Sequence, residues 1–163
     1  MAAVKSMNDL FVHTLKDIYY AEKLIYRSLP KMAKQAASPE LKQAFEKHRE
    51  ETEGQIGRLE QIFELCEVAA RGVRCEAMDG IIAEAKDIME EVEDAEVRDA
   101  GMLAAAQTVE HYEISRYGTM IAWATQLGMT DAAKLLQQTL DEEKKTDKLL
   151  SELAVKRVNQ TAA

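Results

Sequence analysis

The sequence predicts an all-α protein, an antiparallel bundle of four long helices. The chain of 163 residues contains only 7 glycines and 2 prolines. So few turn formers leave little room for a β-sandwich or barrel, which need a turn about every ten residues. Hydrophobic residues make up 47% and charged residues 31% of the chain, as in a globular domain with a core. The length fits a single domain, residues 1–163.

The first helix is predicted over residues 8–36. Its inward positions recur at alternating steps of four and three residues, which is the spacing of the inner face of a bundle helix. Pro30 lies inside this segment and is expected to kink the helix near Tyr26, because proline removes a backbone hydrogen bond. The predicted inner positions are Phe11, Leu15, Ile18, Glu22, Ile25, Leu29, Met32 and Ala36.

The second helix is predicted over residues 39–66. Ser38 as the capping residue, Pro39 at the first helical position and Glu40 in the first turn form a strong start signal. The connection to the first helix is short, which favours antiparallel neighbours. The inner positions are Leu41, Ala44, His48, Glu51, Gln55, Leu59 and Ile62.

The third and fourth long helices are predicted over residues 95–127 and 131–157. Gly128 suits the end of the third helix, and Thr130-Asp131 forms a capping signal for the fourth. The tail after Val158 is expected to fray. The inner positions are Leu103, Ala106, Glu110, Glu113, Tyr117, Met120, Ala124 and Leu127 on the third helix, and Ala133, Leu136, Leu140, Glu143, Asp147, Leu150 and Ala154 on the fourth.

A long connection, roughly residues 67–94, joins the second and third long helices. Its segment 78–92 is itself amphipathic and is predicted to form a short extra helix. Two helical hairpins joined by one long crossover constitute the ferritin-like arrangement.

The two halves of the sequence also indicate an internal duplication. A shift of 92 positions places Glu51 on Glu143, and a shift of 91 places Glu22 on Glu113 and Tyr26 on Tyr117.

Charged residues interrupt every predicted inner face near the middle of its helix. Because the midpoints of antiparallel helices lie at one height, these side chains should meet in one layer. Buried carboxylates cost several kcal/mol each unless they are paired, and the nearest arginines lie only at the borders of these faces. A bound pair of divalent cations would neutralise the layer, and oxygen-rich ligands suit iron or manganese. The predicted metal ligands are Glu22, His48, Glu51, Glu110, Glu113, Glu143 and Asp147.

The alternative interpretation is that these acids lie at the edges of the inner faces, with their carboxylates in water. A chain with 29 acidic residues places several on any face by chance, and Glu142 is interpreted as ordinary solvated surface. The interruption of all four helices near mid-length favours the metal site over this alternative.

Two tyrosines are predicted to support the ligands from outside. Tyr26 lies one turn past Glu22 and Tyr117 one turn past Glu113, so that their hydroxyls could orient ligand carboxylates. Packing at the edge of the bundle is the alternative role.

The chain resembles the YciE/YciF-type ferritin-like proteins from about Met7 to Leu153. The resemblance rests on Asp17-Ile-Tyr-Tyr-Ala-Glu22, on the segment from His48 to Leu59, on Val109-Glu-His-Tyr-Glu-Ile-Ser-Arg-Tyr117 with Trp123-Ala-Thr-Gln-Leu-Gly128, and on Leu140-Asp-Glu-Glu-Lys-Lys-Thr-Asp147. It implies a ferritin-like fold, a dinuclear metal centre, homodimers and stress-linked expression in bacteria.

The sequence departs from the ligand pattern of the wider ferritin-like superfamily, which uses Glu-x-x-His on the second and fourth helices. Gly54 and Thr146 stand where those histidines are expected, and His48 precedes Glu51 instead. This departure casts doubt on ferritin-type ferroxidase ligation and suggests a site richer in acids.

These observations predict a protein that holds about two iron ions per chain, with manganese as the alternative, and reacts with O2 or peroxide. Turnover is left open, and a non-catalytic interaction bundle with a vestigial or empty site is the second hypothesis. The net charge of −8 argues against nucleic-acid binding. No apolar run approaches the roughly 18 residues of a membrane span. Met1 to Leu10 lacks a signal-peptide core, so a cytoplasmic location is expected.

Overall fold

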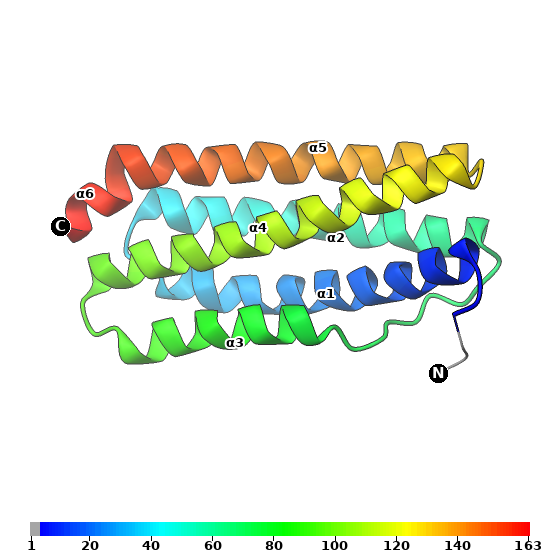
Figure 1. The fold of residues 1–163 in the computed structure, drawn as a ribbon. Helices are drawn as coiled ribbons and strands as arrows, with labels where there is room; N and C mark the ends of the chain where they lie inside the picture. Colours follow the sequence, from blue (N-terminus) through cyan, green and yellow to red (C-terminus); the bar gives the residue numbers. More distant parts are fainter. Residues whose placement is uncertain (1–3) are drawn as a thin grey trace.

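The computed structural model describes residues 4–163 and contains five principal helices in the predicted order (Figure 1). They are α1 (Met7–Gln35), α2 (Pro39–Leu65), α3 (Glu76–Glu91), α4 (Ala95–Gln126) and α5 (Thr130–Leu153). The first three residues of the amino-terminal segment, where no signal peptide is expected, lie outside the described residues. The prediction of an all-α, ferritin-like four-helix bundle is confirmed.

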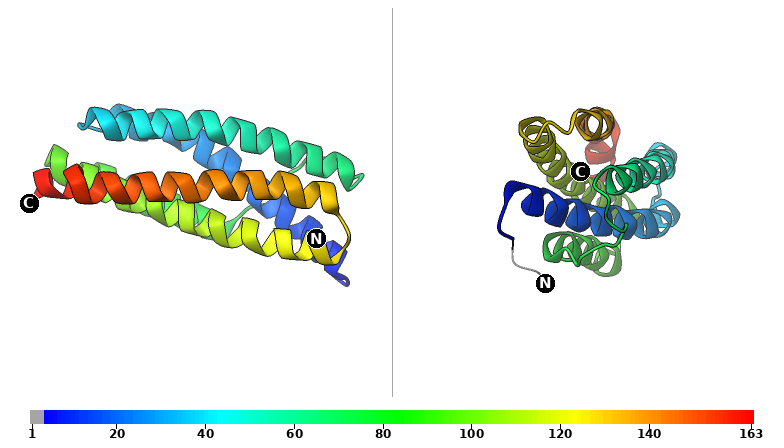
Figure 2. Two further views of the ribbon diagram at one scale, coloured as in Figure 1. Left: turned by 90° about the horizontal axis from the view of Figure 1, so that it is seen from above. Right: turned by 90° about the vertical axis from the view of Figure 1, so that its right-hand side faces the viewer.

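The bundle consists of two antiparallel hairpins, α1–α2 and α4–α5, joined by a crossover that runs back along the molecule (Figure 1). The short helix α3 lies in this crossover and packs on the outside of α1 and α4, as the views in Figure 2 show. Val73 in the crossover donates its backbone N–H to the carbonyl of Lys16 on α1, at 3.1 Å. All four long helices therefore present one face to a common core.

Capping side chains define where several helices begin. The Ser38 hydroxyl accepts the backbone N–H of Leu41 at 3.3 Å and starts α2, as predicted. The Asp94 carboxylate accepts the N–H groups of Glu96 and Val97 at 2.9 and 3.0 Å and starts α4. Helix α5 differs from the prediction, because Met129 precedes it and no side chain caps its first turn.

The ends of two connections are also fixed by specific features. Gly128 adopts a φ of 73° in the short link from α4 to α5, a conformation that glycine adopts without a steric penalty. Near the opposite end of the bundle, the buried carboxylate of Asp99 accepts the backbone N–H groups of Ala37 and Ser38 at 3.0 and 2.6 Å. This pair of bonds ties the start of α4 to the turn between α1 and α2.

The carboxyl-terminal tail is more ordered than the sequence suggests. Helix α5 ends at Leu153, short of the predicted residue 157, and continues as a π-helix (Ala154–Val158) and a short helix α6 (Asn159–Ala162). Val158 is 2% exposed, and its burial against the core explains why the expected fraying does not occur.

Most of the core consists of aliphatic and aromatic side chains from the predicted inner faces. The largest fully buried ones include Phe11, Leu15, Phe45, Phe63 and Met102. At mid-height this apolar packing is interrupted by charged side chains, as the sequence analysis expected. No helix within residues 4–163 is long and apolar enough to cross a membrane.

Candidate metal centre

Five buried ionisable side chains from the four long helices lie at the middle of the bundle. They are Glu22 on α1, His48 on α2, Glu110 and Glu113 on α4, and Glu143 on α5. All four carboxyl groups are 0% exposed and His48 is 3% exposed. We refer to these five residues as the acid–histidine cluster.

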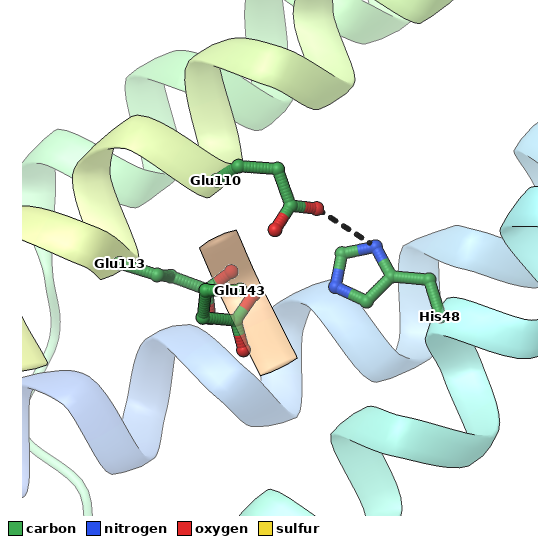
Figure 3. A group of neighbouring side chains, drawn as sticks. All are labelled: His48, Glu110, Glu113 and Glu143. Carbon is green, nitrogen blue, oxygen red and sulfur yellow. Dashed lines mark ion pairs between the residues drawn. The ribbon is translucent and has the colours of Figure 1, made fainter. Parts of the chain in front are cut away.

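Four members of the cluster converge closely enough to share an ion. His48, Glu110, Glu113 and Glu143 each offer one potential ligand atom, and these four atoms all lie within 4.8 Å of one another (Figure 3). The Nδ1 atom of His48 lies 3.2 Å from Oε1 of Glu110. The i, i+3 spacing of Glu110 and Glu113 places both carboxylates on the same face of α4.

Burial shifts the pKa of every member of the cluster in the direction that favours the neutral form of the side chain. Burial and the neighbouring charge of Glu143 raise the pKa of Glu22 to about 8, and burial raises the pKa of Glu143 to about 7. Burial also raises the pKa of Glu110 and Glu113 well above the usual range. It lowers the pKa of His48 to about 4, which leaves a neutral imidazole able to bind a metal ion.

Several cluster atoms lack hydrogen-bond partners among the described residues, although buried polar atoms are normally satisfied. They are Glu22 Oε2, His48 Nε2, both oxygens of Glu110, both oxygens of Glu113, and Glu143 Oε2. All are atoms that ligate metals in proteins, and a set of carboxylate oxygens with one imidazole nitrogen suits iron or manganese. The residues present therefore fit the predicted kind of centre.

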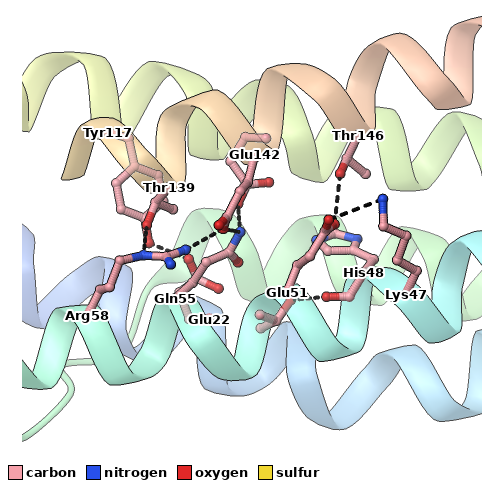
Figure 4. Close-up of polar contacts among 12 residues, drawn as sticks. Glu22, Lys47, His48, Glu51, Gln55, Arg58, Tyr117, Thr139, Glu142 and Thr146 are labelled. Carbon is pink, nitrogen blue, oxygen red and sulfur yellow. Dashed lines mark hydrogen bonds and ion pairs between the residues drawn. The ribbon is translucent and has the colours of Figure 1, made fainter. Parts of the chain in front are cut away.

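Tyr117 and Gln55 hold two of the carboxylates from outside the cluster (Figure 4). The buried Tyr117 hydroxyl donates to Oε1 of Glu22, and its predicted role as the support of a metal ligand stays a prediction. The Gln55 amide donates to Oε1 of Glu143 and, at 3.2 Å, to Glu142. Such contacts fix the orientation of ligand side chains.

An arginine extends this support across the α2–α5 boundary. Arg58 Nε donates to the Thr139 hydroxyl at 2.9 Å, and its guanidinium pairs with Glu142 (Figure 4). Glu142 is therefore not plain surface, contrary to the sequence analysis. Two features of the sequence could have indicated these contacts of Glu142. Gln55 occupies an inner position of α2 one turn past Glu51, and Arg58 lies at the border of that face.

Two predicted ligands lie outside the cluster. Oε1 of Glu51 lies 3.3 Å from the Lys47 ammonium, and its Oε2 accepts the Thr146 hydroxyl at 3.3 Å, with 21% of the Glu51 side chain exposed. Asp147 accepts Gln107 Nε2 at 3.2 Å and faces His111 Nε2 at 3.2 Å. Both acids would have to turn inward to reach a bound ion, and their role as ligands stays a prediction.

Tyr26, the other predicted supporting tyrosine, does not contact the cluster in this structure. Its hydroxyl accepts Arg49 at 3.1 Å, and the Arg49 guanidinium lies 4.6 Å from its ring centroid. The counterpart of Tyr117 under the internal repeat is thus engaged with a charged side chain at the edge of the bundle.

Fold and site together define a ferritin-like four-helix bundle with a buried carboxylate–histidine cluster. The chain belongs to the family described as Domain of unknown function (DUF892), which matches residues 6–163. It includes the YciE/YciF-type proteins that the sequence resembles, so the predicted family is confirmed. The Escherichia coli K12 protein YciF is 48% identical over 160 residues, which cover 98% of this chain and 96% of YciF.

Solved structures agree with this assignment. The crystal structure of the Escherichia coli stress protein YciF matches with a TM-score of 0.92 and 48% identity, covering 96% of this chain and 99% of that one. The Rhodopseudomonas palustris protein YcfI matches with a TM-score of 0.90 and 47% identity, over 92% and 96% of the two chains. A Xanthomonas campestris protein with 22% identity and a TM-score of 0.76, covering 92% of each chain, shares the fold.

Proposed function

We propose that this protein holds a dinuclear metal centre that reacts with O2 or a peroxide. Iron is the preferred metal and manganese is the alternative. The observation that carries the proposal is the set of unpartnered ligand atoms in the acid–histidine cluster. A hydrocarbon layer would stabilise the bundle better than buried carboxyl groups. Cation binding supplies a reason for their presence.

The residues that would hold the metal ions are Glu22, Glu110, Glu113, Glu143 and the Nε2 atom of His48. Bound iron or manganese would supply the electrons that reduce the oxidant. The protein contributes the geometry and the exclusion of water: Tyr117 orients Glu22, Gln55 orients Glu143, and the surrounding core keeps the layer dry. Both ferroxidase-like and peroxidase-like outcomes are compatible with this arrangement.

Anaerobic titration with Fe(II) tests the proposal. We expect the uptake of about two ions per chain, followed by a ferric absorbance when O2 or peroxide is added. Glu113→Gln should abolish or weaken the uptake, whereas Glu53→Gln on the exposed face of α2 should not. The absence of uptake above background in the parent protein would overturn the proposal.

A non-catalytic interaction bundle is the second candidate function. The raised pKa of Glu22, about 8, favours it, because protonated carboxyls make a metal-free layer less costly at neutral pH. Calorimetry with and without Fe(II) or Mn(II) separates the two functions. A metal-dependent rise in Tm supports the metal protein, and an unchanged Tm supports the interaction bundle.

The biological role, the oligomeric state and the location of the protein are also proposals. The relative YciF is described as a stress protein, and we extend a stress-associated role, a homodimeric state and a cytoplasmic location to this chain. Sedimentation of the purified protein tests the dimer: a single species at twice the 18.3 kDa chain mass supports it, and a monomer contradicts it.

A further inference from the structure

A pocket of about 240 Å³ lies between α2 and α5. Its lining includes Ala44, Lys47 and Glu51 from α2, and Lys145, Thr146 and Lys148 from α5. A second pocket of about 580 Å³ shares Ala44, Lys47 and Leu149 with it. The two pockets therefore adjoin one another along this side of the bundle.

The inner wall of the smaller pocket adjoins the cluster. Glu51 lies three residues past His48 on α2, and Thr146 lies three residues past Glu143 on α5. Residues with this spacing share a helix face and are one turn apart. Each of these two wall residues therefore lies one helical turn from a cluster member on its own helix.

Glu51 closes the α2–α5 boundary at this wall. Its carboxylate accepts the Thr146 hydroxyl across the boundary at 3.3 Å and pairs with Lys47 on its own helix at 3.3 Å (Figure 4). The Lys47 side chain is 46% exposed, so this ion pair is screened by solvent and weak. A rotation of one partly exposed carboxylate is enough to separate Glu51 from Thr146.

We propose that this pocket is the access route for the oxidant and that Glu51 is its gate. The inference rests on the proposed function. It narrows the oxidant to a small molecule such as O2 or a peroxide, neutral or anionic, because the displacement of one side chain opens only a small gap beside the buried cluster.

The charges around the pocket favour the passage of an oxidant over the passage of a metal ion. The pocket carries three lysines, Lys47, Lys145 and Lys148, against two glutamates, Glu51 and Glu152, on a chain whose net charge is −8. This excess of one positive charge is confined to the smaller pocket, because the larger one adds Glu40, Glu46 and Glu50. Next to the Glu51–Thr146 contact it disfavours a divalent cation more than a small anion or a neutral molecule. We therefore expect metal ions to reach the cluster by a different path.

Azide binding to the cobalt-loaded protein tests the route without depending on turnover. Cobalt(II) serves as the spectroscopic metal and azide as a small anionic ligand that must reach it, with association followed by stopped-flow absorbance. Ala44→Phe fills the pocket and should slow azide association about tenfold, a change of about 1.4 kcal/mol in the barrier. Thr146→Val removes the hydroxyl that Glu51 accepts, leaves the charge of the pocket unchanged, and should speed association severalfold.

A matched control alters the other boundary of α5, the one that it shares with α4. Gln107→Leu alters the α4–α5 boundary, where Gln107 contacts Asp147 and Ser151, and should leave azide association unchanged. Cobalt uptake should keep the parent rate and stoichiometry in all three variants. The opposite signs expected for Ala44→Phe and Thr146→Val separate gating from a general disturbance of the fold.

Two results would overturn the gate. One is azide association at the parent rate in both pocket variants. The other is cobalt uptake slowed as much as azide association, which would make the pocket a common entrance. Failure of the parent protein to take up any cobalt is a distinguishable outcome, because it would overturn the proposed function itself and this inference with it.

Discussion

The hydroxyl of Tyr117 on α4 donates a hydrogen bond to Oε1 of Glu22 on α1, and both side chains are 0% exposed. The contact joins the two helical hairpins at the height of the acid–histidine cluster. It also leaves Oε2 of Glu22 without a partner among the described residues, so one oxygen is fixed while the other remains available to a metal ion.

Replacing Tyr117 by phenylalanine should destabilise the apo protein by about 1 to 3 kcal/mol at pH 8, because it leaves a buried carboxylate oxygen without its donor. Urea denaturation measures the effect. The matched control is Tyr26→Phe, whose hydroxyl accepts only Arg49 at the edge of the bundle, and its effect should stay within about 0.5 kcal/mol. Equal losses for both variants would contradict the assigned role of Tyr117.

Replacing Glu113 by glutamine should have opposite effects on stability and on metal binding. The apo protein should become more stable at pH 8 by about 1 to 3 kcal/mol, because the substitution removes a buried group that is costly to ionise. Metal uptake should fall, because a ligand oxygen is lost. Thermal unfolding and metal titration of the same sample measure both effects, and a variant that is less stable yet binds metal normally would refute the assignment.

The stability of the apo protein should fall as the pH rises from 6.5 to 8. The pKa of Glu22 is raised from 4.5 to about 8 in the folded state, so its stabilisation is complete below pH 4.5 and is lost as the pH rises through 8. The pKa of His48 is lowered from 6.5 to about 4, so its contribution is complete above pH 6.5 and is lost as the pH falls through 4. Between pH 6.5 and 8 the carboxyl groups therefore dominate.

Glu22 alone should reduce the free energy of unfolding by about 1.5 kcal/mol over that interval, and the other raised carboxyl groups act in the same direction. Denaturant titrations at pH 6.5 and pH 8 in the presence of a chelator measure the loss. Metal should reduce or reverse it, because metal ions bind the ionised carboxylates. An apo protein that is more stable at pH 8 would show that these groups are not buried as described.

Gln55→Leu should weaken metal binding about tenfold or more without removing a ligand, because Gln55 orients Glu143. Competition with a coloured chelator measures the affinity. Gln61→Leu is the control, since Gln61 is exposed and its amide contacts only the Gly57 carbonyl, at 3.4 Å. Identical affinities for the two variants would assign Gln55 to packing alone.

Helical periodicity was sufficient to predict the bundle and the layer at its middle. Glu22, Glu110, Glu113 and Glu143 interrupt otherwise apolar faces, and all four are fully buried. Periodicity assigns a residue to a helix face, and for these positions the face points directly at the bundle axis. The crossover helix α3 was predicted in the same way, from the apolar spacing of its own segment, residues 78–92.

Periodicity could not distinguish Glu51 from Glu143, which coincide under the internal repeat. Glu143 is fully buried, whereas Glu51 turns toward Lys47, one turn earlier on α2, and Thr146 on the neighbouring helix. The choice depends on which charged neighbour each carboxylate meets and on how far each helix is rotated about its own axis. Neither quantity is encoded in the spacing of apolar residues along one helix.

Anomalous X-ray diffraction from crystals grown anaerobically with Fe(II) or Mn(II) tests the central claim most directly. The account predicts two anomalous peaks at mid-bundle, about 2.0 to 2.3 Å from carboxylate oxygens or the imidazole nitrogen of Glu22, His48, Glu110, Glu113 and Glu143. Ions bound only to exposed acids, with no anomalous peak at the cluster, would contradict it.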